Sequence, residues 1–472
     1  MPESADAAAS PDTSDQTVDV VVVGTGPGGE SLAGALARGG LEVVAVERRL
    51  VGGECPYFGC IPSKIMIRAA NVLAEARRVA GTAGEADVRP DWAPVAARIR
   101  EEATDDWDDR VAVERLEAAG VRVMRGTARL SGPREVVVEA GRGPVTLRAR
   151  LGVVLNTGTE PAAPPIDGLA ATPYWTNRDA MRVRDLPTRL TVLGGGAIGC
   201  ELAQAFARFG VEVTVLEAGP RILGPEEPEA AEVVAGALAA DGIAVHAGTT
   251  VTRVSHADGL FRVQHAGGIV ESEALLVAAG RRSNLADLGL ETVGLDPSAR
   301  FLDTDERMRA GEGLWAIGDI TGRGAFTHMS MYQAAVAARD LLGEDGPWAE
   351  YGAVSRVTFT DPEVGSVGLT EAQARDAGIT VATGLTDLTA SSRGWIHGPG
   401  PDGTANSGLV KLVADADRGV LVGATTAGPA GGEMIGMLVT AVHARVPLET
   451  LRTMVYAYPT FHRAIESALA DL

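Results

Sequence analysis

The sequence predicts an α/β protein in which one strand–turn–helix–strand unit occurs twice before a separate α+β domain. The first copy begins in residues 18–29 (VDVVVVGTGPGG), where an apolar β-branched run ends in a glycine-rich turn, and residues 190–199 (LTVLGGGAIG) repeat this plan. In both copies a small-residue helix and a second strand follow, and that strand ends in an acid, Glu47 or Glu217, 23 residues after the first glycine. From about residue 347 alternating strand and helix patterns predict the third domain.

The glycines in each copy follow the spacing G-x-G-x-x-G. The first glycine permits a tight turn, the second lets backbone approach a pyrophosphate, and the third lets the helix pack on the strand. Phosphates then lie at the positive helix N-terminus, and the acid accepts hydrogen bonds from a ribose. Two copies with matching acids predict two Rossmann-like, three-layer dinucleotide-binding domains, against the alternative of chance glycine-rich turns. The glycines are Gly24, Gly26 and Gly29, then Gly194, Gly196 and Gly199.

Length and charge limit the possible classes of protein. A chain of 472 residues favours about three domains. The net charge of −20 argues against nucleic acid or an anionic membrane as a partner. No run of eighteen apolar residues occurs, so we expect no membrane span. Residues 1–16 are polar and acidic, which predicts a disordered tail rather than a secretory signal, and we expect a cytoplasmic protein.

Residues 52–64 (GGECPYFGCIPSK) concentrate rare residue types. Cys55 and Cys60 are two of only three cysteines, and Lys64 is one of only two lysines. In a reducing compartment, a close cysteine pair is more often redox-active or metal-binding than structural. Two cysteines at the start of a helix can form a disulfide that opens without large backbone motion, and the helix N-terminus stabilises their thiolates. The alternative is a pair of buried structural cysteines, and we predict no metal site.

This motif, placed between the two glycine-rich turns, resembles the class I pyridine nucleotide-disulfide oxidoreductases, which include dihydrolipoamide dehydrogenase, glutathione reductase and mercuric reductase. The resemblance extends over nearly the whole chain after the tail. It implies FAD and NAD(P)H as cofactors, and a homodimer in which the partner's C-terminal segment completes each active site. Further segments that resemble family motifs are TGTEP at 157–161, GRRSN at 280–284, AIGD at 316–319 and FTDPEVGSVGLTE at 359–371.

The resemblance also implies domain boundaries, because in this family the second domain is inserted into the first. Residues 17–160 and 285–346 would form the two parts of an FAD-binding domain. Residues 161–284 would form the NAD(P)-binding domain. Residues 347–472 would form the dimerisation or interface domain.

The family's chemistry assigns roles to the motif. Electrons would pass from NAD(P)H through FAD to the cysteine pair and on to a small-molecule or small-protein acceptor, with Cys60 facing the flavin and Cys55 exchanging with substrate. Lys64 would pair with Glu201 and stabilise negative charge on the reduced flavin, where a compact ammonium fits better than a guanidinium. The alternative for Lys64 is a surface lysine.

Cofactor-binding residues follow from the same resemblance. Glu217 would accept from a ribose 2′-hydroxyl and repel a 2′-phosphate, which favours NADH, although Arg221 could soften this preference and NADPH stays possible. Asp319 could instead be a turn former, His328 a packing residue and Cys200 a small buried filler. The predicted FAD residues are Gly24, Gly26, Gly29, Glu47, Gly53, Lys64, Gly126, Thr157, Gly158, Gly318, Asp319 and His328. The predicted nicotinamide nucleotide residues are Gly194, Gly196, Gly199, Glu217 and Gly280.

The C-terminus departs from the family pattern HxHPTxxE. Residues 456–463 read YAYPTFHR, so Tyr458 takes the place of the acid–base histidine and Arg463 that of its glutamate. A tyrosine with a pKa near 10 is a poor base at neutral pH. His462, four residues on, could share a helical face with Tyr458 and serve instead, or be a surface or packing residue. Mercuric reductase also carries this tyrosine, but no cysteine follows Cys200 here to form its C-terminal pair.

Three functions remain open at this stage. The first is a disulfide reductase of the dihydrolipoamide dehydrogenase kind. The second is a reductase of a quinone or metal ion, since Pro56, Tyr57 and Phe58 could narrow the disulfide pocket or stack on an aromatic acceptor, or could simply be packing residues. The third is a weakly active flavoprotein that acts as a redox sensor or complex subunit.

Overall fold

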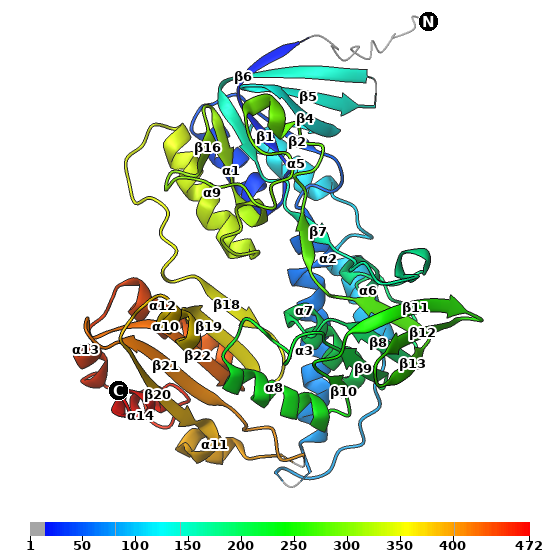
Figure 1. Cartoon of the computed structure of the whole chain (residues 1–472), viewed down its shortest axis with the longest axis vertical. Helices are drawn as coiled ribbons and strands as arrows, with labels where there is room; N and C mark the ends of the chain where they lie inside the picture. Colours follow the sequence, from blue (N-terminus) through cyan, green and yellow to red (C-terminus); the bar gives the residue numbers. More distant parts are fainter. Residues whose placement is uncertain (1–14, 81, 142, 401) are drawn as a thin grey trace, which may run out of the picture. The chain divides into compact units, whose positions relative to one another are not determined.

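A computed structural model gives the structure of the protein and describes residues 15–80, 82–141, 143–400 and 402–472. Of the predicted tail at residues 1–16, residues 1–14 lie outside the described residues, whereas Gln16 already belongs to the first strand, so the tail was predicted too long at that end. The chain divides into two compact units, shown in Figure 1. The first unit comprises residues up to 55, 108–160 and 282–349. The second comprises 56–107, 161–281 and 350–472.

The first unit is built on a largely parallel sheet. Its strand order is β16-β17-β6-β1-β2-β3, and the central strand β1 pairs in parallel with both β2 and β6. The valines of β1 are buried, as expected for a strand covered on both faces. The strands are β1 (Gln16–Val23), β2 (Val43–Glu47), β3 (Arg122–Arg125), β4 (Thr127–Gly132), β5 (Glu135–Ala140), β6 (Gly143–Leu155), β16 (Arg309–Gly311) and β17 (Leu314–Ala316).

Helices cover one face of this sheet. Helix α1 (Pro27–Arg38) starts with a proline at its first turn, which suits that position, and packs with α9 (Thr327–Leu341) against the sheet. Leu32 and Leu36 of α1 are fully buried there. Helix α5 (Arg110–Ala118) adds Leu116 to the same core. On the other face, a second core joins β4, β5 and β6 to residues 285–302 and includes η3 (Leu290–Val293).

The second unit contains another parallel sheet, of strand order β10-β9-β8-β14. Helix α7 (Ala197–Arg208) follows β8 (Arg189–Leu193), and β9 (Glu212–Leu216) follows α7, as the repeated plan predicts. Helix α3 (Cys60–Arg77) shares a core with α7 through Met66 and Ala70. The other elements are α8 (Pro228–Ala240), β10 (Ala244–His246), β11 (Val251–Ala257), β12 (Leu260–His265), β13 (Gly268–Ser272) and β14 (Ala274–Val277).

The C-terminal part of the second unit is an antiparallel sheet with helices. Its order is β18-β19-β22-β21-β20, and α12 and α14 bury Leu438 and Ile465 in its core. These elements are β18 (Ser355–Thr358), β19 (Glu363–Gly368), α10 (Glu371–Asp376), β20 (Val381–Asp387), α11 (Ser392–His397), β21 (Leu409–Asp415), β22 (Val420–Gly428), α12 (Gly431–His443), α13 (Leu448–Arg452) and α14 (Arg463–Ala470).

The predicted fold class is confirmed: two parallel dinucleotide-type sheets precede an α+β domain. The chain leaves the first unit after Cys55 and returns at Asp108, and it leaves again after Glu160 and returns at Arg282. The finer division into three domains stays a prediction. The remaining short elements are α2 (Glu54–Phe58), α4 (Ala93–Arg98), the π-helix η1 (Ile99–Ala103), β7 (Thr159–Pro161), η2 (Leu169–Ala171), α6 (Asn177–Ala180), β15 (Arg281–Ser283), η4 (Gly318–Thr321) and η5 (Leu388–Ala390).

Candidate active site

The first glycine-rich turn joins β1 to α1 in the first unit. Gly24 has a φ of +93°, and a Cβ there would collide with the Asn156 carbonyl. A Cβ on Gly29 would collide with the Gly24 carbonyl. Glu47 Oε2 accepts hydrogen bonds of 2.9 Å from both Thr25 N and Thr25 Oγ1, which hold the carboxylate beside the turn. The turn therefore has the shape and the ribose acceptor of a dinucleotide site.

Two side chains that sequence reasoning missed also fix this turn. Asn156 Nδ2 donates to the carbonyls of Gly24 and Gly26 at 3.2 and 3.4 Å, and Asn156 Oδ1 accepts from Ser330 Oγ at 3.2 Å. Next to Asn156, the hydroxyl of Thr157 is buried and has no hydrogen-bond partner among the described residues. A buried hydroxyl is costly unless it is bonded, so a ligand oxygen at this turn would satisfy it. These residues fit the ADP half of FAD.

Other predicted FAD residues surround the same turn. Gly318 has a φ of +78°, and a Cβ there would lie 3.0 Å from Asn156 Oδ1. A Cβ on Gly53 would lie 2.8 Å from Gly26 Cα. Asp319 Oδ2 accepts from Thr159 Oγ1 at 2.6 Å. Gly53 also has a positive φ, of +69°, and the positive φ together with these close contacts explains why glycine occupies both positions.

The remaining predicted residues of the first unit lie in supporting positions. The Gly126 amide donates to the Glu47 carbonyl at 3.0 Å, and the Gly158 carbonyl accepts from the Asn284 amide at 2.9 Å. His328 stacks on Phe326, with ring centroids 5.2 Å apart and an interplanar angle of 5°. This contact is local to the start of α9, so a flavin role for His328 stays a prediction.

The second glycine-rich turn repeats the geometry of the first. Gly194 has a φ of +107°, and a Cβ there would lie 2.5 Å from the Ala278 carbonyl. A Cβ on Gly199 would collide with the Gly194 carbonyl, as in the first copy. Glu217 accepts from Gly195 N at 2.6 Å and from Gly219 N at 2.5 Å, which fixes its carboxylate beside the turn. The sequence repeat is therefore a structural repeat down to the hydrogen bonds of the acid.

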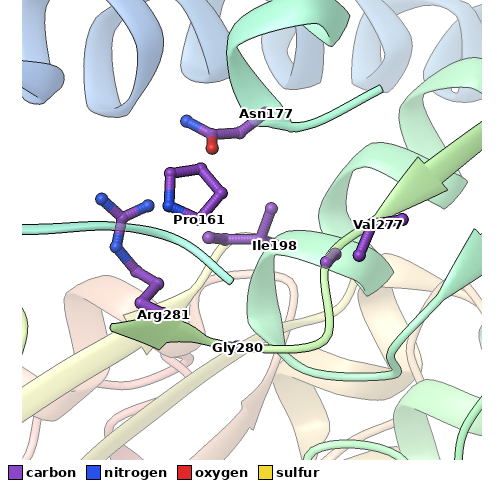
Figure 2. Close-up of a pocket in the computed structure, with 7 residues that line it drawn as sticks. Pro161, Asn177, Ile198, Val277, Gly280 and Arg281 are labelled. Atoms are coloured by element: carbon purple, nitrogen blue, oxygen red, sulfur yellow. The ribbon is translucent and has the colours of Figure 1, made fainter. Parts of the chain in front are cut away.

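A pocket opens at this turn, where α7 begins and β14 ends. Figure 2 shows the residues around it, with Asn177 above, Gly280 below and Val277 to the right. Ile198, in the first turn of α7, is 38% exposed and faces this space. Because helix N-termini favour phosphate groups, the pocket suits a dinucleotide. Its lining residues are Pro161, Asn177, Ile198, Val277, Ala278, Gly280 and Arg281.

The Arg221 guanidinium is hydrogen-bonded to backbone carbonyls rather than directed at the pocket. Its Nη1 donates to the Gly224 carbonyl and its Nη2 to the Glu226 carbonyl, both at 2.8 Å. These two bonds commit the guanidinium to the backbone of the following loop. Arg221 could in principle weaken the preference of Glu217 for NADH over NADPH by binding a 2′-phosphate. These hydrogen bonds disfavour that role.

The cysteine pair occupies two consecutive helices. Cys55 lies in α2, and Cys60 is the first residue of the 18-residue helix α3, with Gly59 between the two helices. Cys55 is half-buried and Cys60 is exposed. A thiolate at the first position of a long helix would be stabilised by the helix dipole, and the redox role of the pair stays a prediction.

Lys64 lies one turn after Cys60 and pairs with Glu201 of α7. Lys64 Nζ is 2.8 Å from Glu201 Oε2, and the Glu201 side chain is only 7% exposed. Glu201 Oε1 accepts from the Phe359 amide at 2.8 Å, and Lys64 Nζ lies 4.5 Å from the centroid of the Phe359 ring. The predicted contact between Lys64 and Glu201 is present, and its role toward a flavin stays a prediction.

Cys200 is buried at the start of α7 and is chemically different from the pair. Its thiol donates to the Gly195 carbonyl at 3.3 Å. Burial, reinforced by Glu201 and Glu217, raises the pKa of Cys200 to about 12. The thiol therefore stays protonated at neutral pH, as expected of a small filler rather than a redox centre.

Tyr458 and His462 lie near the C-terminus of the second unit. The Tyr458 side chain is 67% exposed, and its hydroxyl lies 3.2 Å from Ser392 Oγ. The Arg463 guanidinium lies 5.6 Å from the Tyr458 ring centroid. His462 immediately precedes α14 rather than lying within it, so the shared helical face with Tyr458 that the sequence suggested is not formed. Catalytic roles for both residues stay predictions.

Two dinucleotide-type turns, and a cysteine pair whose second member begins helix α3, are features of an oxidoreductase that combines two nucleotide cofactors with a dithiol. Comparison with known proteins specifies the family. Residues 18–339 match the model of the pyridine nucleotide-disulphide oxidoreductases, and residues 354–469 match the dimerisation domain of the same family. The chain belongs to this family.

Curated relatives and solved structures agree with this assignment. A dihydrolipoyl dehydrogenase of Thermus scotoductus is 34% identical over 97% of this chain and 98% of its own. A mercuric reductase of Acidithiobacillus ferrooxidans is 32% identical over 96% of this chain and 82% of its own. The HOCl-induced flavoprotein disulfide reductase RclA of Escherichia coli, solved as a Cu(II) complex, has a TM-score of 0.82 and 26% identity, covering 96% of this chain and 99% of RclA, and a further RclA structure has a TM-score of 0.81. LpdA of Mycobacterium tuberculosis has a TM-score of 0.83 and 25% identity over the same shares.

These findings confirm the predicted enzyme class. The protein is an NAD(P)H-dependent flavoprotein disulfide oxidoreductase whose family uses FAD, and its dimerisation domain supports the predicted homodimer. Within the described part of the chain, no helix has the length and apolar character needed to cross a bilayer.

Proposed function

We propose that this enzyme oxidises NADH and delivers the electrons through FAD to a Cys55–Cys60 disulfide, which then reduces a disulfide substrate. The observation that carries the proposal is the placement of Cys60 at the first residue of α3, one turn before the Lys64–Glu201 ion pair. A thiol at a helix start and, one turn later, a half-buried ammonium paired with a buried carboxylate suit a dithiol that cycles between two redox states.

The proposed steps balance in electrons and protons. Bound FAD supplies the chemistry that converts the hydride of NADH into two electrons for the cysteine disulfide. NADH, a proton and the Cys55–Cys60 disulfide then give NAD⁺ and two thiols. Cys55, the half-buried member of the pair, attacks one sulfur of the substrate disulfide, which breaks the substrate S–S bond, forms a mixed disulfide and releases the first substrate thiol. Cys60 then attacks the Cys55 sulfur, which breaks the mixed disulfide, releases the second substrate thiol and re-forms the cysteine disulfide; the two protons of the enzyme thiols leave on the substrate thiols.

NADH is the proposed donor because of the second turn. Glu217 is held by two backbone amides, where a ribose 2′-hydroxyl can donate to it and a 2′-phosphate would be repelled. Arg221, the nearest candidate for binding a 2′-phosphate, is already bonded to two carbonyls. A homodimer in a reducing, cytoplasmic setting remains part of the proposal, since the chain has only three cysteines.

A second candidate function is the reduction of a thiophilic metal ion. The observation that favours it is Tyr458, which takes the place of the family's acid–base histidine and is 67% exposed. A metal ion bound by two thiolates needs no proton donor for its reduction, whereas a leaving thiolate does. The relatives named for mercuric reduction and solved with Cu(II) point in the same direction.

Steady-state turnover of the wild type and of Cys55→Ser separates the candidates. With NADH in excess, lipoamide and glutathione disulfide probe disulfide reduction, and Cu(II) and Hg(II) probe metal reduction. The proposal predicts that lipoamide or glutathione disulfide is the better acceptor and that Cys55→Ser abolishes its reduction. Faster reduction of Cu(II) or Hg(II), equally lost in Cys55→Ser, would favour the second candidate. Unchanged turnover of every acceptor in Cys55→Ser would contradict both.

A further inference from the structure

Residues 56–59, which separate the two cysteines, are held from outside by two side-chain donors. The Tyr57 carbonyl accepts a hydrogen bond from the Trp107 indole Nε1 at 3.2 Å. The Phe58 carbonyl accepts one from Asn177 Nδ2 at 2.7 Å. Two consecutive carbonyls of the connecting segment are therefore anchored, one by each donor. All four residues belong to the second unit.

The Trp107 anchor comes from an unusual stretch of backbone. The π-helix η1 ends at Ala103, and Asp105, Asp106 and Trp107 then adopt φ values of +46°, +54° and +60°. Non-glycine residues in this left-handed region store strain, which persists only where the surrounding structure holds it. The Arg182 guanidinium lies 5.0 Å from the Trp107 ring and 4.9 Å from the Phe58 ring, so it joins this stretch to the connecting segment by two cation–π contacts.

Asn177, the second donor, is positioned by its neighbours Trp175 and Thr176. Trp175, two residues earlier, pairs with β14: its amide donates to the Leu275 carbonyl at 2.7 Å and its carbonyl accepts from the Val277 amide at 2.8 Å. Thr176 then caps α6 with a capping box closed by Asp179. These bonds fix Asn177, which is buried, beside β14, whose last residue, Val277, also lines the pocket.

The Asn177 side chain also lines the dinucleotide pocket. It lines that pocket together with Pro161, Ile198 and Gly280, and Figure 2 shows its carboxamide oxygen on the side of the Pro161 ring. A carboxamide carries one oxygen acceptor and two N–H donors. One side chain therefore touches both the space for the nicotinamide nucleotide and the segment between the cysteines.

We propose that Asn177 is a positioning residue that transmits nucleotide binding to the redox cysteine pair. A nucleotide in the pocket restrains the Asn177 carboxamide and strengthens its hold on the Phe58 carbonyl. The connecting segment then has fewer conformations in the dithiol state, so the effective concentration of one thiol at the other rises and the disulfide is favoured. This inference rests on the proposed redox role of Cys55 and Cys60.

The test measures the thiol–disulfide equilibrium itself rather than turnover. The FAD-loaded enzyme is equilibrated in dithiothreitol buffers, in which the Cys55–Cys60 disulfide and reduced dithiothreitol exchange with the dithiol and cyclic oxidised dithiothreitol. Acid quenching, alkylation and peptide mass analysis then give the fraction of each state. Each series is run with and without tetrahydro-NADH, a dinucleotide that binds as NADH does but has no hydride to transfer.

Three variants separate the roles. Asn177→Ala removes the proposed link, and Trp107→Phe removes the other anchor while keeping an aromatic ring beside Arg182. Asn406→Ala is the matched control, because Asn406 is a buried asparagine whose Nδ2 donates to another backbone carbonyl, that of Gly394, at 3.1 Å. Circular dichroism and flavin content of each variant verify that it is folded and loaded.

The expected result has a distinct pattern. In the wild type, tetrahydro-NADH shifts the equilibrium toward the disulfide by roughly three- to tenfold, the range that one hydrogen bond supports, and tenfold corresponds to about 30 mV. Trp107→Phe moves the equilibrium toward the dithiol but keeps the nucleotide response, Asn177→Ala loses the response, and Asn406→Ala behaves as the wild type.

Two results would overturn the inference. If Asn177→Ala keeps the full nucleotide response, or the wild type shows none, Asn177 does not transmit binding, although the cysteine pair still cycles and the proposed function stands. If Cys55 and Cys60 form no disulfide at any buffer ratio, the proposed function fails and the inference fails with it.

Discussion

The second glycine of the nicotinamide turn, Gly196, provides a prediction in which folding and binding separate. A Cβ added at Gly196 meets no heavy atom of the described residues within 4 Å. The backbone there has φ −76° and ψ −177°, which alanine adopts without strain. Gly196→Ala should therefore fold normally. The space that the Cβ would fill is where a pyrophosphate must approach the backbone, so nucleotide binding should suffer.

The size of the effect follows from the contacts that a displaced phosphate loses. One hydrogen bond from a backbone amide to a charged group is worth about 1.5–3 kcal/mol. Losing one such bond weakens binding by roughly ten- to hundredfold. The dissociation constant for NADH of Gly196→Ala, measured from the concentration dependence of anaerobic flavin reduction in a stopped-flow instrument, should rise by this factor.

Two other glycines serve as matched controls. Gly236→Ala lies in the exposed middle of α8, where a Cβ also meets nothing within 4 Å, and it should raise the free energy of unfolding by about 1 kcal/mol with no change in NADH binding. Gly199→Ala would collide with the Gly194 carbonyl, so it should lower both stability and binding. The reasoning is refuted if Gly196→Ala binds NADH within twofold of the wild type, or if it is destabilised like Gly199→Ala.

Three further predictions concern other sites. Lys411 is buried between Glu227, Glu229 and Glu371, with Nζ 3.0, 2.7 and 3.0 Å from their carboxylate oxygens. Burial alone would lower the pKa of Lys411, but the hydrogen bonds that its ammonium donates to these carboxylates raise it. Lys411→Met should lower the free energy of unfolding in urea by about 3–5 kcal/mol, because Glu227 would be left buried without its ion pair. A loss below 1 kcal/mol would contradict this role. Iodoacetamide at pH 8 should modify Cys55 and Cys60 of the reduced enzyme but leave Cys200 intact in peptide mass spectra, because the raised pKa of Cys200 keeps its thiol protonated until the pH nears about 12; modification of Cys200 at the rate of the pair would show that it is accessible and ionised. Tyr458→Phe, which removes the hydroxyl beside Ser392, should leave the rate of flavin reduction by NADH unchanged and affect only acceptor turnover, whereas a slower reductive half-reaction would place Tyr458 in the wrong half of the cycle.

The glycine-rich turns could be predicted from sequence because their constraints are local. A positive φ at Gly24 and Gly194, and the close approach of Gly29 and Gly199 to a carbonyl, arise within one strand–turn–helix unit. In both copies an acid follows the first glycine at the same distance, and this spacing also predicts which carboxylate accepts hydrogen bonds from the ribose. Local sterics are therefore sufficient to predict the fold class and both dinucleotide turns without any long-range contact.

The side chains that complete these sites could not be predicted in the same way. Asn156 and Ser330 are 174 residues apart, and only tertiary pairing of β6 and α9 beside β1 brings them to the first turn. No spacing rule connects them. A signal existed for Asn156 alone, since a polar residue directly after the buried run of β6 is unusual and marks the end of a strand in a dinucleotide sheet.

Asn177 and His462 show the two kinds of error that sequence spacing allows. Asn177 lies in an unremarkable stretch, and its two-sided position depends on the pairing of Trp175 with β14. The spacing of four residues suggested that His462 and Tyr458 share one face of a helix. Helix α14 begins only at Arg463, so neither residue lies in a helix and the shared face does not form. The rare-lysine signal was more reliable, because both lysines, Lys64 and Lys411, lie in ion pairs with carboxylates.

The most direct test of the account is an anaerobic titration of the FAD-loaded wild type with NADH, in which thiols are counted by alkylation and mass analysis at each step. The account predicts that the first equivalent of NADH produces two new thiols, at Cys55 and Cys60, and a long-wavelength absorbance that Cys60→Ser lacks. If the flavin is fully bleached while both cysteines remain unalkylated, electrons do not reach the pair and the central claim is wrong.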